Sequence, residues 1–486
     1  MVNEKEEHGM DRREFIKGSG VAAAAAIGGG ACASVTGKAE KLAYLGGTPV
    51  ISKDESNAIA ERIFEWPIVN DAMRKASDNI LSKGKMSGTD VTKEFERKVA
   101  AWNGTKYALA CLNGTTALNT AFYAIGIKPG DEVICPSITM WASCMGVVNL
   151  GGTVVFCDIK EEDLTIDPKS FEERITPRTK AVVVVHYMGS PCDMDAIMAI
   201  AKKHNLKVVE DVSHAQGGLY KGRKLGTIGD IGAMSLMSGK SFAIGEAGMF
   251  VTDSLEYYEK AIRWGMYARI PGTFGVDRTA RTLDVPFGGI KNRLNQCTAA
   301  VGIEQLKKYD SEMAEIEKAM LYWWNGLKDI DFLKIIYPKW EKSNKAGWYS
   351  SRGLFLTERV PGVDNRVFAK AVSAELGRGF YSAGCNFPLH YSSVFNDEDI
   401  FGNGLPPSKR YLPDGVTSAK TTGKLPVAEG INARLIGDPW FKRFDKAVVD
   451  RFLEAIHKVA KNIDQLRGVE PPKGSGYSYW PATKRA

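Results

Sequence analysis

The sequence predicts an α/β fold, in which a mostly parallel sheet lies between helices and a smaller C-terminal α/β domain follows. Two observations support this prediction. The chain is long enough for one large and one smaller core, because 44% of its 486 residues are hydrophobic and 25% are charged. Short apolar runs also alternate with helical stretches between residues 105 and 255, a pattern typical of parallel strands buried on both faces. The runs are YALACL, DEVICPS, TVVFCDI, KAVVVVH, LKVVED, IGAMSLM and GMFVTD.

The expected helices follow from the spacing of apolar residues. One begins near Ala117, after the first strand. A longer helix has apolar residues four and three positions apart, which places them on one face. These residues are Ala299, Ile303, Leu306, Tyr309, Met313, Ile316, Met320, Trp323 and Leu327. Beyond Pro338 the chain is rich in loops, and its last helix is apolar at Val449, Phe452, Ile456, Val459 and Ile463. The patterns predict a large domain over 41–330, a small domain over 331–470 and a tail over 471–486.

Residues 1–40 are expected to form an export signal and a linker. The segment DRREFIK carries paired arginines and precedes a weakly apolar run rich in alanine and glycine, the order found in twin-arginine signals. That run is too short and too rich in glycine for a transmembrane helix. Gly29 stands where a lipoprotein signal usually has leucine, which disfavours lipidation at Cys32. We therefore expect a periplasmic protein exported by the twin-arginine translocation machinery; a basic tail on a cytoplasmic protein is the alternative.

Composition excludes several classes of function. The net charge of +7 is mild for this length, and no zinc, helix-turn-helix or ribonucleoprotein signature occurs, so nucleic acid is not an expected partner. The eight cysteines are scattered without a C-x-x-C pair and are expected in the core. The six histidines form no H-x-x-x-H or H-E-x-x-H pattern, so no metal site is expected.

Polar side chains follow three of the predicted strands at their carboxyl ends, the edge at which α/β sheets bind ligands. Thr115 and Thr116 follow YALACL, Asp211 ends LKVVED, and His186 ends KAVVVVH. The segment NGTTAL places a glycine and two threonines before a helix, where free N–H groups and hydroxyls hold phosphate. The same segment is also typical of an ordinary helix cap.

Asp211 and Lys240 indicate which kind of ligand these polar residues bind. A carboxylate at Asp211 would keep a pyridine nitrogen protonated, although an acid at a strand end is also a common helix cap. A lone lysine is usually a surface charge. Lys240, however, lies among serines and glycine in SLMSGKS, where it can reach a bound aldehyde and where burial favours its nucleophilic neutral form. A phosphate-binding turn, an acid and a lysine together indicate pyridoxal 5′-phosphate.

With these residues in place, the chain resembles the DegT/StrS-type (DegT/DnrJ/StrS) sugar aminotransferases of fold type I of the pyridoxal-phosphate enzymes. The resemblance covers about residues 80–465, and the segments are specific when taken jointly. They are MSGTDVTKEFERKVAAW, NGTTAL, KPGDEVICPSITMWAS, ITPRTKAVVVVHYMGSPCDMDAI, VVEDVSHAQGGLYKGRKLGTIGDIGAMSLMSGK, KNRLNQCTAAVGIEQL and KLPVAE.

The resemblance implies a role for each matched residue. Lys240 would carry the cofactor in a Schiff-base linkage and move protons, and Asp211 would pair with the pyridine nitrogen. His214 would approach the oxygen on the cofactor ring. The phosphate would be bound by Gly114, Thr115, Thr116 and Ser235.

Two segments depart from the family pattern. The family commonly has an aromatic residue after PSIT that stacks on the cofactor, whereas this chain has Met140 followed by Trp141, and either could take that role. The family's G-x-N-x-R segment lends an asparagine to the neighbouring subunit's phosphate, but here it is GIKNR, with Lys291 in that position and Asn292 beside it. A lysine also suits a dianion. The resemblance therefore implies a homodimer with shared sites.

The implied activity is a ping-pong transfer of an amino group, usually from glutamate or glutamine, to a keto-sugar or keto-cyclitol. His186 and His390 are candidates for substrate contact, and a structural role is an equal alternative for each. A pyridoxal-phosphate dehydratase or lyase of the same family is a second possibility, which Lys240 disfavours because family dehydratases usually have histidine there. A non-catalytic exported binding protein is a third.

Overall fold

The structure is a computed structural model, and it describes residues 40–266, 269, 286, 288–400, 402, 404–407 and 424–473. The expected export signal up to residue 39 and most of the expected tail lie outside these residues. Within the described residues no helix has the length and apolar character needed to cross a membrane. The described cysteines are buried, apart from Cys297, which is half-buried.

The main sheet has seven strands in the order β1-β9-β8-β5-β4-β2-β3. Every pairing among β3, β2, β4, β5 and β8 is parallel, and β9 runs antiparallel between β8 and β1. All seven apolar runs form these strands, so the predicted fold class is confirmed. Their bounds are β1 (Tyr107–Cys111), β2 (Glu132–Pro136), β3 (Thr153–Cys157), β4 (Thr179–Val185), β5 (Lys207–Asp211), β8 (Ile231–Ser235) and β9 (Gly248–Thr252).

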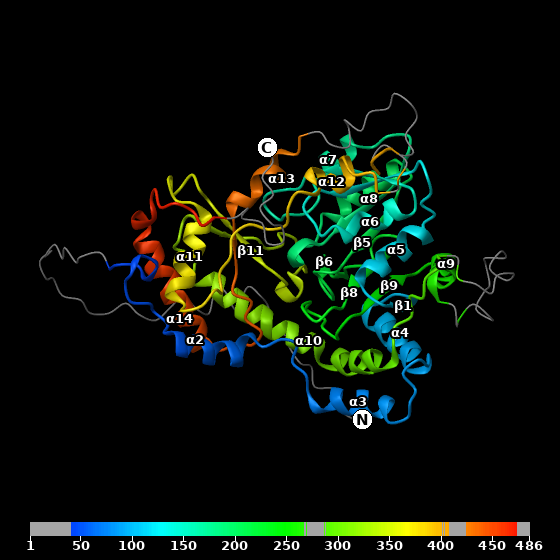
Figure 1. Cartoon of the computed structure of the whole chain (residues 1–486), viewed down its shortest axis with the longest axis horizontal. Helices are drawn as coiled ribbons and strands as arrows, with labels where there is room; N and C mark the ends of the chain where they lie inside the picture. Colours follow the sequence, from blue (N-terminus) through cyan, green and yellow to red (C-terminus); the bar gives the residue numbers. More distant parts are fainter. Residues whose placement is uncertain are drawn as a thin grey trace, which may run out of the picture. The chain divides into compact units, whose positions relative to one another are not determined.

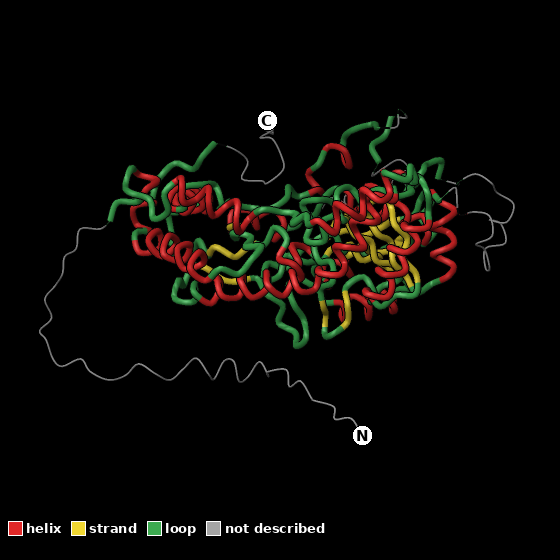
Figure 2. Tube along the Cα trace, turned by 90° about the horizontal axis from the view of Figure 1, so that it is seen from below, coloured by secondary structure: helices red, strands yellow, loops and turns green. Residues whose placement is uncertain are grey.

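Helices cover both faces of this sheet because successive strand residues point to opposite sides. Val183 and Val185 of β4 pack in one apolar cluster, whereas Val182 and Val184 pack in another. The first cluster includes helices α5 (Gly114–Ala124), α6 (Ala142–Asn149) and α9 (Leu255–Gly265). The second includes α4 (Asp90–Asn103), α7 (Pro168–Glu173), α8 (Met194–Lys203) and α10 (Gln296–Asn325). Figure 2 shows the yellow strands of the sheet between red helices.

The long helix α10 is the one predicted from the apolar stripe, and it ends two residues before Leu327. Asn295 caps its first turn by accepting a hydrogen bond from the Thr298 N–H at 2.9 Å. In Figure 1 the helix runs from the neighbourhood of α4 to that of α14, and it contacts both. Its first half packs beneath the main sheet, and its second half belongs to a third apolar cluster.

The third cluster surrounds a small antiparallel sheet of β10 (Leu333–Ile335), β11 (Arg352–Phe355) and β12 (Leu435–Gly437). Helices α11 (Asn365–Glu375) and α14 (Lys446–Lys461) contribute apolar side chains to it, as does the second half of α10. Leu42, Ile51 and Ile59 also pack in this cluster, although they lie within the range 41–330 that the sequence predicts as the large domain. The N–H of Ile51 bonds to the carbonyl of Glu375 at 2.9 Å, so chain segments distant in sequence share this core. The boundary at residue 330 stays a prediction.

The remaining elements are short or lie outside the two sheets. They are α2 (Lys53–Ile59), α3 (Asp71–Leu81), α12 (Ser393–Asn396), α13 (Pro426–Gly430) and the ribbon of β6 (Leu219–Tyr220) with β7 (Arg223–Lys224).

Candidate active site

A cavity of about 490 Å³ opens where β1, β2, β4, β5 and β8 end, at the carboxyl edge of the parallel strands. Eight of the residues proposed from sequence line it: Gly114, Thr115, Met140, Trp141, Asp211, His214, Ser235 and Lys240. The sheet therefore brings together side chains from loops that are up to 126 positions apart in the sequence.

Asp211 is the last residue of β5 and is held rigidly. Its Oδ2 accepts a hydrogen bond from the Ser143 hydroxyl at 2.6 Å, and its Oδ1 accepts one from the Ser213 N–H at 3.0 Å. The Ser143 oxygen is in turn 2.8 Å from the Thr139 hydroxyl. Only 3% of Asp211 is exposed. These two donors fix the direction of the carboxylate.

Lys240 lies in the same cavity with its amine 4.1 Å from the centre of the Tyr349 ring. Burial lowers the pKa of Lys240 to about 8, against the opposing effect of the Asp211 charge. A sizeable fraction of the amine is therefore neutral near pH 7.5, the form that attacks an aldehyde. The indole N–H of Trp66 donates to the Lys240 carbonyl at 2.8 Å and fixes its backbone.

His214 approaches the cavity with one defined nitrogen. Its Nδ1 accepts the backbone N–H of Met188 at 3.2 Å, so the neutral ring carries its proton on Nε2. Burial, aided by the nearby Lys240 charge, places the pKa of His214 well below its ordinary value. The histidine is therefore a neutral donor through Nε2.

The amino end of α5 forms the expected anion site. Gly114 and Thr115 are the first two residues of this helix, and their N–H groups have no partner within it. A side chain on Gly114 would lie 2.6 Å from Cβ of Ser235, so glycine is required for the helix to approach the end of β8. This close approach brings the helix terminus and the Ser235 hydroxyl to one wall of the cavity.

Thr116 has a different role from the one expected. It forms a capping box with Asn113: the Thr116 N–H donates to Asn113 Oδ1 at 2.9 Å, and the Asn113 N–H donates to the Thr116 hydroxyl oxygen at 3.2 Å. The Thr116 hydroxyl in turn donates to the Asn113 carbonyl at 2.9 Å. Thr116 does not line the cavity. The capping alternative considered for NGTTAL thus applies to Thr116, whereas Gly114 and Thr115 face the cavity.

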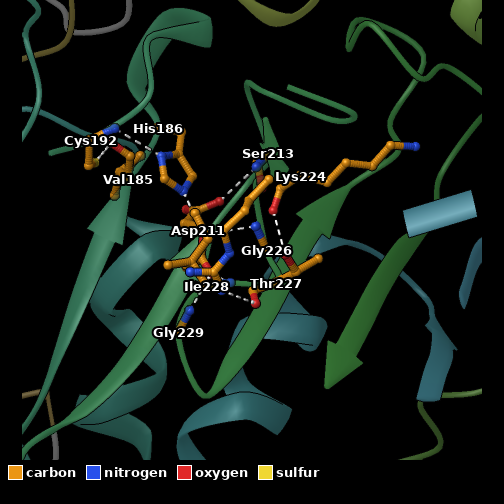
Figure 3. A network of polar contacts seen from close by, with 12 residues as sticks. Val185, His186, Cys192, Asp211, Ser213, Lys224, Gly226, Thr227, Ile228 and Gly229 are labelled. Carbon is orange, nitrogen blue, oxygen red and sulfur yellow. Dashed lines mark hydrogen bonds and ion pairs between the residues drawn. The ribbon is translucent and has the colours of Figure 1, made fainter. Parts of the chain in front are cut away.

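His186 is a structural residue rather than a substrate contact. It is fully buried, its Nδ1 accepts the Cys192 N–H at 3.1 Å, and its Nε2 lies 3.0 Å from Glu210 Oε2. Glu210 also accepts the N–H groups of Gly226, Ile228 and Gly229, at 2.8, 2.7 and 2.6 Å. Figure 3 shows this network, which ties the end of β4 to the turn before β8.

His390 is also corrected. It is 3% exposed, its Nδ1 is 2.6 Å from the Ser137 hydroxyl, and its Nε2 is 3.4 Å from Glu429. Burial lowers the pKa of His390, so the ring is a neutral link between β2 and α13. Its neighbour Leu389 lines the cavity, but His390 does not.

Lys291 and Asn292 do not line this cavity, and they differ in burial: Asn292 is buried, whereas Lys291 is exposed. Asn292 is 1% exposed, accepts the Leu112 N–H at 3.1 Å and donates to Thr120 at 3.0 Å. Its amide oxygen and one amide hydrogen are therefore used within its own chain, and its contact with a neighbouring subunit's phosphate stays a prediction. Lys291 is exposed beside it, and its contact with a partner's cofactor stays a prediction.

Sequence analysis missed Ser143, Trp66, Tyr349 and Asn386. Ser143 lies four residues after Thr139 on the next turn of chain, a spacing that could have drawn attention to it. The other three reach the cavity region from segments with no recognisable motif, so only the fold reveals them.

The arrangement fits pyridoxal 5′-phosphate on its own chemistry. The helix terminus at Gly114 and Thr115 suits a phosphate, Asp211 suits a protonated pyridine nitrogen, and His214 Nε2 suits a ring oxygen. The Lys240 amine is buried without a hydrogen bond to any of the described residues, so it is available for a covalent bond to an aldehyde. The described residues contain no cluster of three or more metal-ligating side chains.

Comparison with known sequences gives a consistent result. The sequence profile of the DegT/DnrJ/EryC1/StrS aminotransferase family matches residues 67–457. Over 413 residues the chain is 30% identical to the spore coat polysaccharide biosynthesis protein SpsC of Bacillus subtilis, covering 82% of this chain and 97% of that protein. Over 397 residues it is 34% identical to a Micromonospora echinospora protein provisionally named L-glutamine:3-amino-2,3-dideoxy-scyllo-inosose aminotransferase, covering 77% and 88%.

A third relative matches over a shorter stretch. GDP-perosamine synthase of Caulobacter vibrioides is 40% identical over 227 residues, which are 47% of this chain and 59% of that protein. Among solved structures, the aminotransferase of Psychrobacter cryohalolentis superposes with a TM-score of 0.70 at 28% identity, over 82% of this chain and 99% of that chain.

Proposed function

The chain belongs to the DegT/DnrJ/EryC1/StrS aminotransferase family, and on that premise we propose that it moves an amino group from glutamate or glutamine to a free keto-sugar or keto-cyclitol. It is a pyridoxal-phosphate-dependent sugar aminotransferase of fold type I. The single observation that carries the proposal is the composition of the cavity wall around Lys240 and Asp211.

When bound, the cofactor would supply an electron sink for the negative charge left by removal of the α-proton. The chain's own residues then do the rest. Asp211, fixed by Ser143 and Ser213, would hold a proton on the ring nitrogen, and His214 would donate from Nε2 to the ring oxygen. Lys240, whose pKa burial lowers to about 8, would be the amine that accepts the α-proton of the amino donor and delivers a proton back to the substrate in the second half-reaction.

The charges on the wall support an uncharged acceptor. Among the described lining residues, Lys240 is the sole lysine and arginine is lacking, while Asp211 and Glu246 are acidic. A nucleotide diphosphate needs cationic partners, so a linked sugar would meet a poorly matched surface here. A ring bearing only hydroxyls needs none. The relative provisionally named for an amino-scyllo-inosose is in keeping with a cyclitol acceptor and a glutamine donor.

A homodimer with shared sites belongs to the same proposal. Leu112, Met140, Trp141 and Ile290 are large apolar side chains that are 36–44% exposed in the single chain. Met140 and Trp141 line the cavity, and Leu112 is joined to the segment after Ile290 through Asn292. A partner chain would cover such a surface and bring Lys291 towards the phosphate end.

The shared site can be tested by complementation. Lys240→Ala and Lys291→Glu variants are each expected to be nearly inactive, but after mixing and subunit exchange one site per mixed dimer has both residues intact. Activity should therefore reappear. If the mixture stays inactive while exchange is demonstrated by differential labelling, Lys291 does not act across a subunit boundary.

Export to the periplasm is the proposed location, because DRREFIK precedes the fold and free keto-sugars do not require the cytoplasmic nucleotide pool. Changing Arg12 and Arg13 together to lysine should remove the protein from the periplasmic fraction. An unchanged distribution would favour the cytoplasmic alternative and reopen nucleotide-linked sugars as substrates.

The deciding experiment is a substrate panel with purified enzyme. Free keto-cyclitols, free keto-sugars and nucleotide-linked keto-sugars are each offered with glutamate or glutamine, and the amine product is measured by mass spectrometry. We expect product from a free acceptor and none from linked ones. A preference for linked sugars would overturn the substrate class, and elimination of a hydroxyl without amine transfer would support the dehydratase alternative.

A further inference from the structure

Four residues that line the cavity are not adjacent in sequence to any expected cofactor-binding residue: Ser350, Asn386, Phe387 and Leu389. We call them one wall of the cavity. Asn386 is the only asparagine or glutamine of this described wall and is half-buried. Its side chain is therefore a fixed polar group in otherwise largely apolar surroundings, the kind of group that sets specificity in small-molecule sites.

Tyr187 determines which way the Asn386 amide faces. Tyr187 follows β4, is 1% exposed, and its hydroxyl donates to Asn386 Oδ1 at 2.5 Å. The same hydroxyl oxygen accepts the Asn386 backbone N–H at 3.3 Å, so its own proton is left for Oδ1. The amide oxygen is thus committed to Tyr187, and the NH₂ group is turned away from it.

The NH₂ group of Asn386 is the polar group left for a ligand. The Asn386 carbonyl accepts a hydrogen bond from Asn432 Nδ2 at 3.3 Å, and no acceptor among the described residues takes the Asn386 Nδ2 hydrogens. The Tyr187 ring also lies beside His214, with ring centroids 5.4 Å apart. The amide is therefore held close to the cofactor end of the cavity by a buried, rigid neighbour.

A ping-pong aminotransferase presents one site to two different molecules. The amino acid brings an α-carboxylate, and the acceptor brings hydroxyls and no charge. An arginine would suit the carboxylate but would be left buried and unpaired beside the uncharged ring. A neutral N–H donor serves both, because carboxylate and hydroxyl oxygens both accept hydrogen bonds.

We propose that the Asn386 NH₂ group is the shared recognition donor of both half-reactions, binding the α-carboxylate of the amino donor and then a hydroxyl of the acceptor. This inference rests on the proposed function. It assigns the specificity role to the side chain that Tyr187 orients, and it explains how a cavity without a described arginine handles an amino acid.

The first test measures binding without turnover. 2-Aminoisobutyrate carries an amine and an α-carboxylate but no α-hydrogen, and isopropylamine is its counterpart without the carboxylate. Spectral titration of the cofactor-loaded enzyme gives a Kd for each. Asn386→Leu should weaken 2-aminoisobutyrate by about tenfold to a hundredfold, the loss expected for one hydrogen bond to a charged group, and leave isopropylamine within twofold.

The second test separates the two half-reactions in single turnovers. Asn386→Asp replaces the donor by a negative charge, so the glutamate or glutamine half-reaction should fall at least tenfold further than the half-reaction of the aminated enzyme with scyllo-inosose. Tyr187→Phe, which frees the amide to rotate, should lower both by about threefold to tenfold. Asn57→Asp on the exposed face of α2 adds the same charge outside the cavity and controls for net charge.

The outcomes are distinguishable. Equal weakening of both amines by Asn386→Leu would indicate a structural role and overturn the inference, as would equal losses in both half-reactions for Asn386→Asp. If the enzyme fails to aminate any free acceptor, the proposed function fails, yet the Kd ratio of the two amines still decides whether Asn386 binds carboxylate.

Discussion

Glu210 and Asp211 are consecutive carboxylates at the end of one strand, and their surroundings and hydrogen-bond partners differ. Their side chains point to opposite faces of the sheet because strand residues alternate. Both are buried, at 0% and 3% exposure. Glu210 accepts four hydrogen bonds, from His186 and three backbone N–H groups, whereas Asp211 accepts two and faces a cavity.

The difference shows that burial alone does not separate a structural acid from a functional one. The two oxygens of Glu210 each receive two donors, which uses their capacity and leaves nothing for a ligand. Asp211 is oriented by Ser143 and Ser213 but retains acceptor capacity towards the cavity. The informative quantity is therefore the unused hydrogen-bonding capacity of a buried group.

The largest expected effect is on activity at Asp211. Asp211→Asn keeps an acceptor for the Ser213 N–H but cannot hold a pyridinium charge, so kcat should fall on the order of 10²–10⁴-fold while cofactor still binds. Single-turnover kinetics and cofactor absorbance measure the two. Near-normal kcat would remove the electron-sink role, and the melting temperature serves as the control for folding.

The second effect is on stability at Glu210. Each carboxylate oxygen of Glu210 accepts two hydrogen bonds. Glu210→Gln therefore replaces one of these acceptors by an NH₂ group that faces two donors. The free energy of unfolding should fall by about 1–3 kcal/mol in denaturant titration, while kcat of the folded enzyme changes less than threefold. A large loss of kcat with unchanged stability would reverse the comparison.

The same variant should change the response to acid. Burial raises the pKa of Glu210, but the hydrogen bonds from His186, Gly229 and Gly226 outweigh it and lower the pKa below the ordinary value of 4.5. The ionised form therefore stabilises the fold above about pH 4.5, and this contribution is lost as the pH falls through the folded pKa. Glu210→Gln should flatten that part of the acid-unfolding curve; an unchanged curve would contradict the assignment.

The third effect concerns Lys240, the amine on the cavity side. Because burial lowers its pKa to about 8, the rate at which the cofactor-free chain captures pyridoxal 5′-phosphate should rise about tenfold per pH unit below pH 8 and level off above it. Stopped-flow absorbance measures the rate, and Lys240→Ala gives the background. A midpoint near the ordinary value of 10.5 would show that burial does not govern this amine.

The smallest effect is expected at Ser143, which positions Asp211 without reaching a substrate. Ser143→Ala removes one of the two donors that orient Asp211, so kcat should fall about threefold to tenfold. Ser143→Thr keeps the hydroxyl and should recover most of kcat. Loss of stability without a change in kcat would indicate packing alone.

Sequence patterns were sufficient for the main sheet because its strands are buried on both faces and are therefore continuous apolar runs. They also placed Lys240 and Asp211 in one cavity, since both follow strand ends within motifs whose residue types suit one cofactor; the roles of the two residues in binding it stay predictions. They failed for His186 and His390, because a buried histidine and a substrate-binding histidine have the same local sequence. The structural role of each histidine is visible only from its partner, which is Glu210 in β5 for His186 and Ser137, the residue after β2, for His390.

Local periodicity and contiguous motifs in the sequence were enough for the fold class and the family, and they predict which residues bind the cofactor. Tertiary structure alone decided which buried groups keep unused hydrogen-bonding capacity. Asn386 lies 199 positions from Tyr187, and Trp66 lies 174 positions from Lys240, so no local pattern relates them. The physical reason is that a hydrogen bond depends on separation in space, and for such pairs the packing of the chain sets that separation.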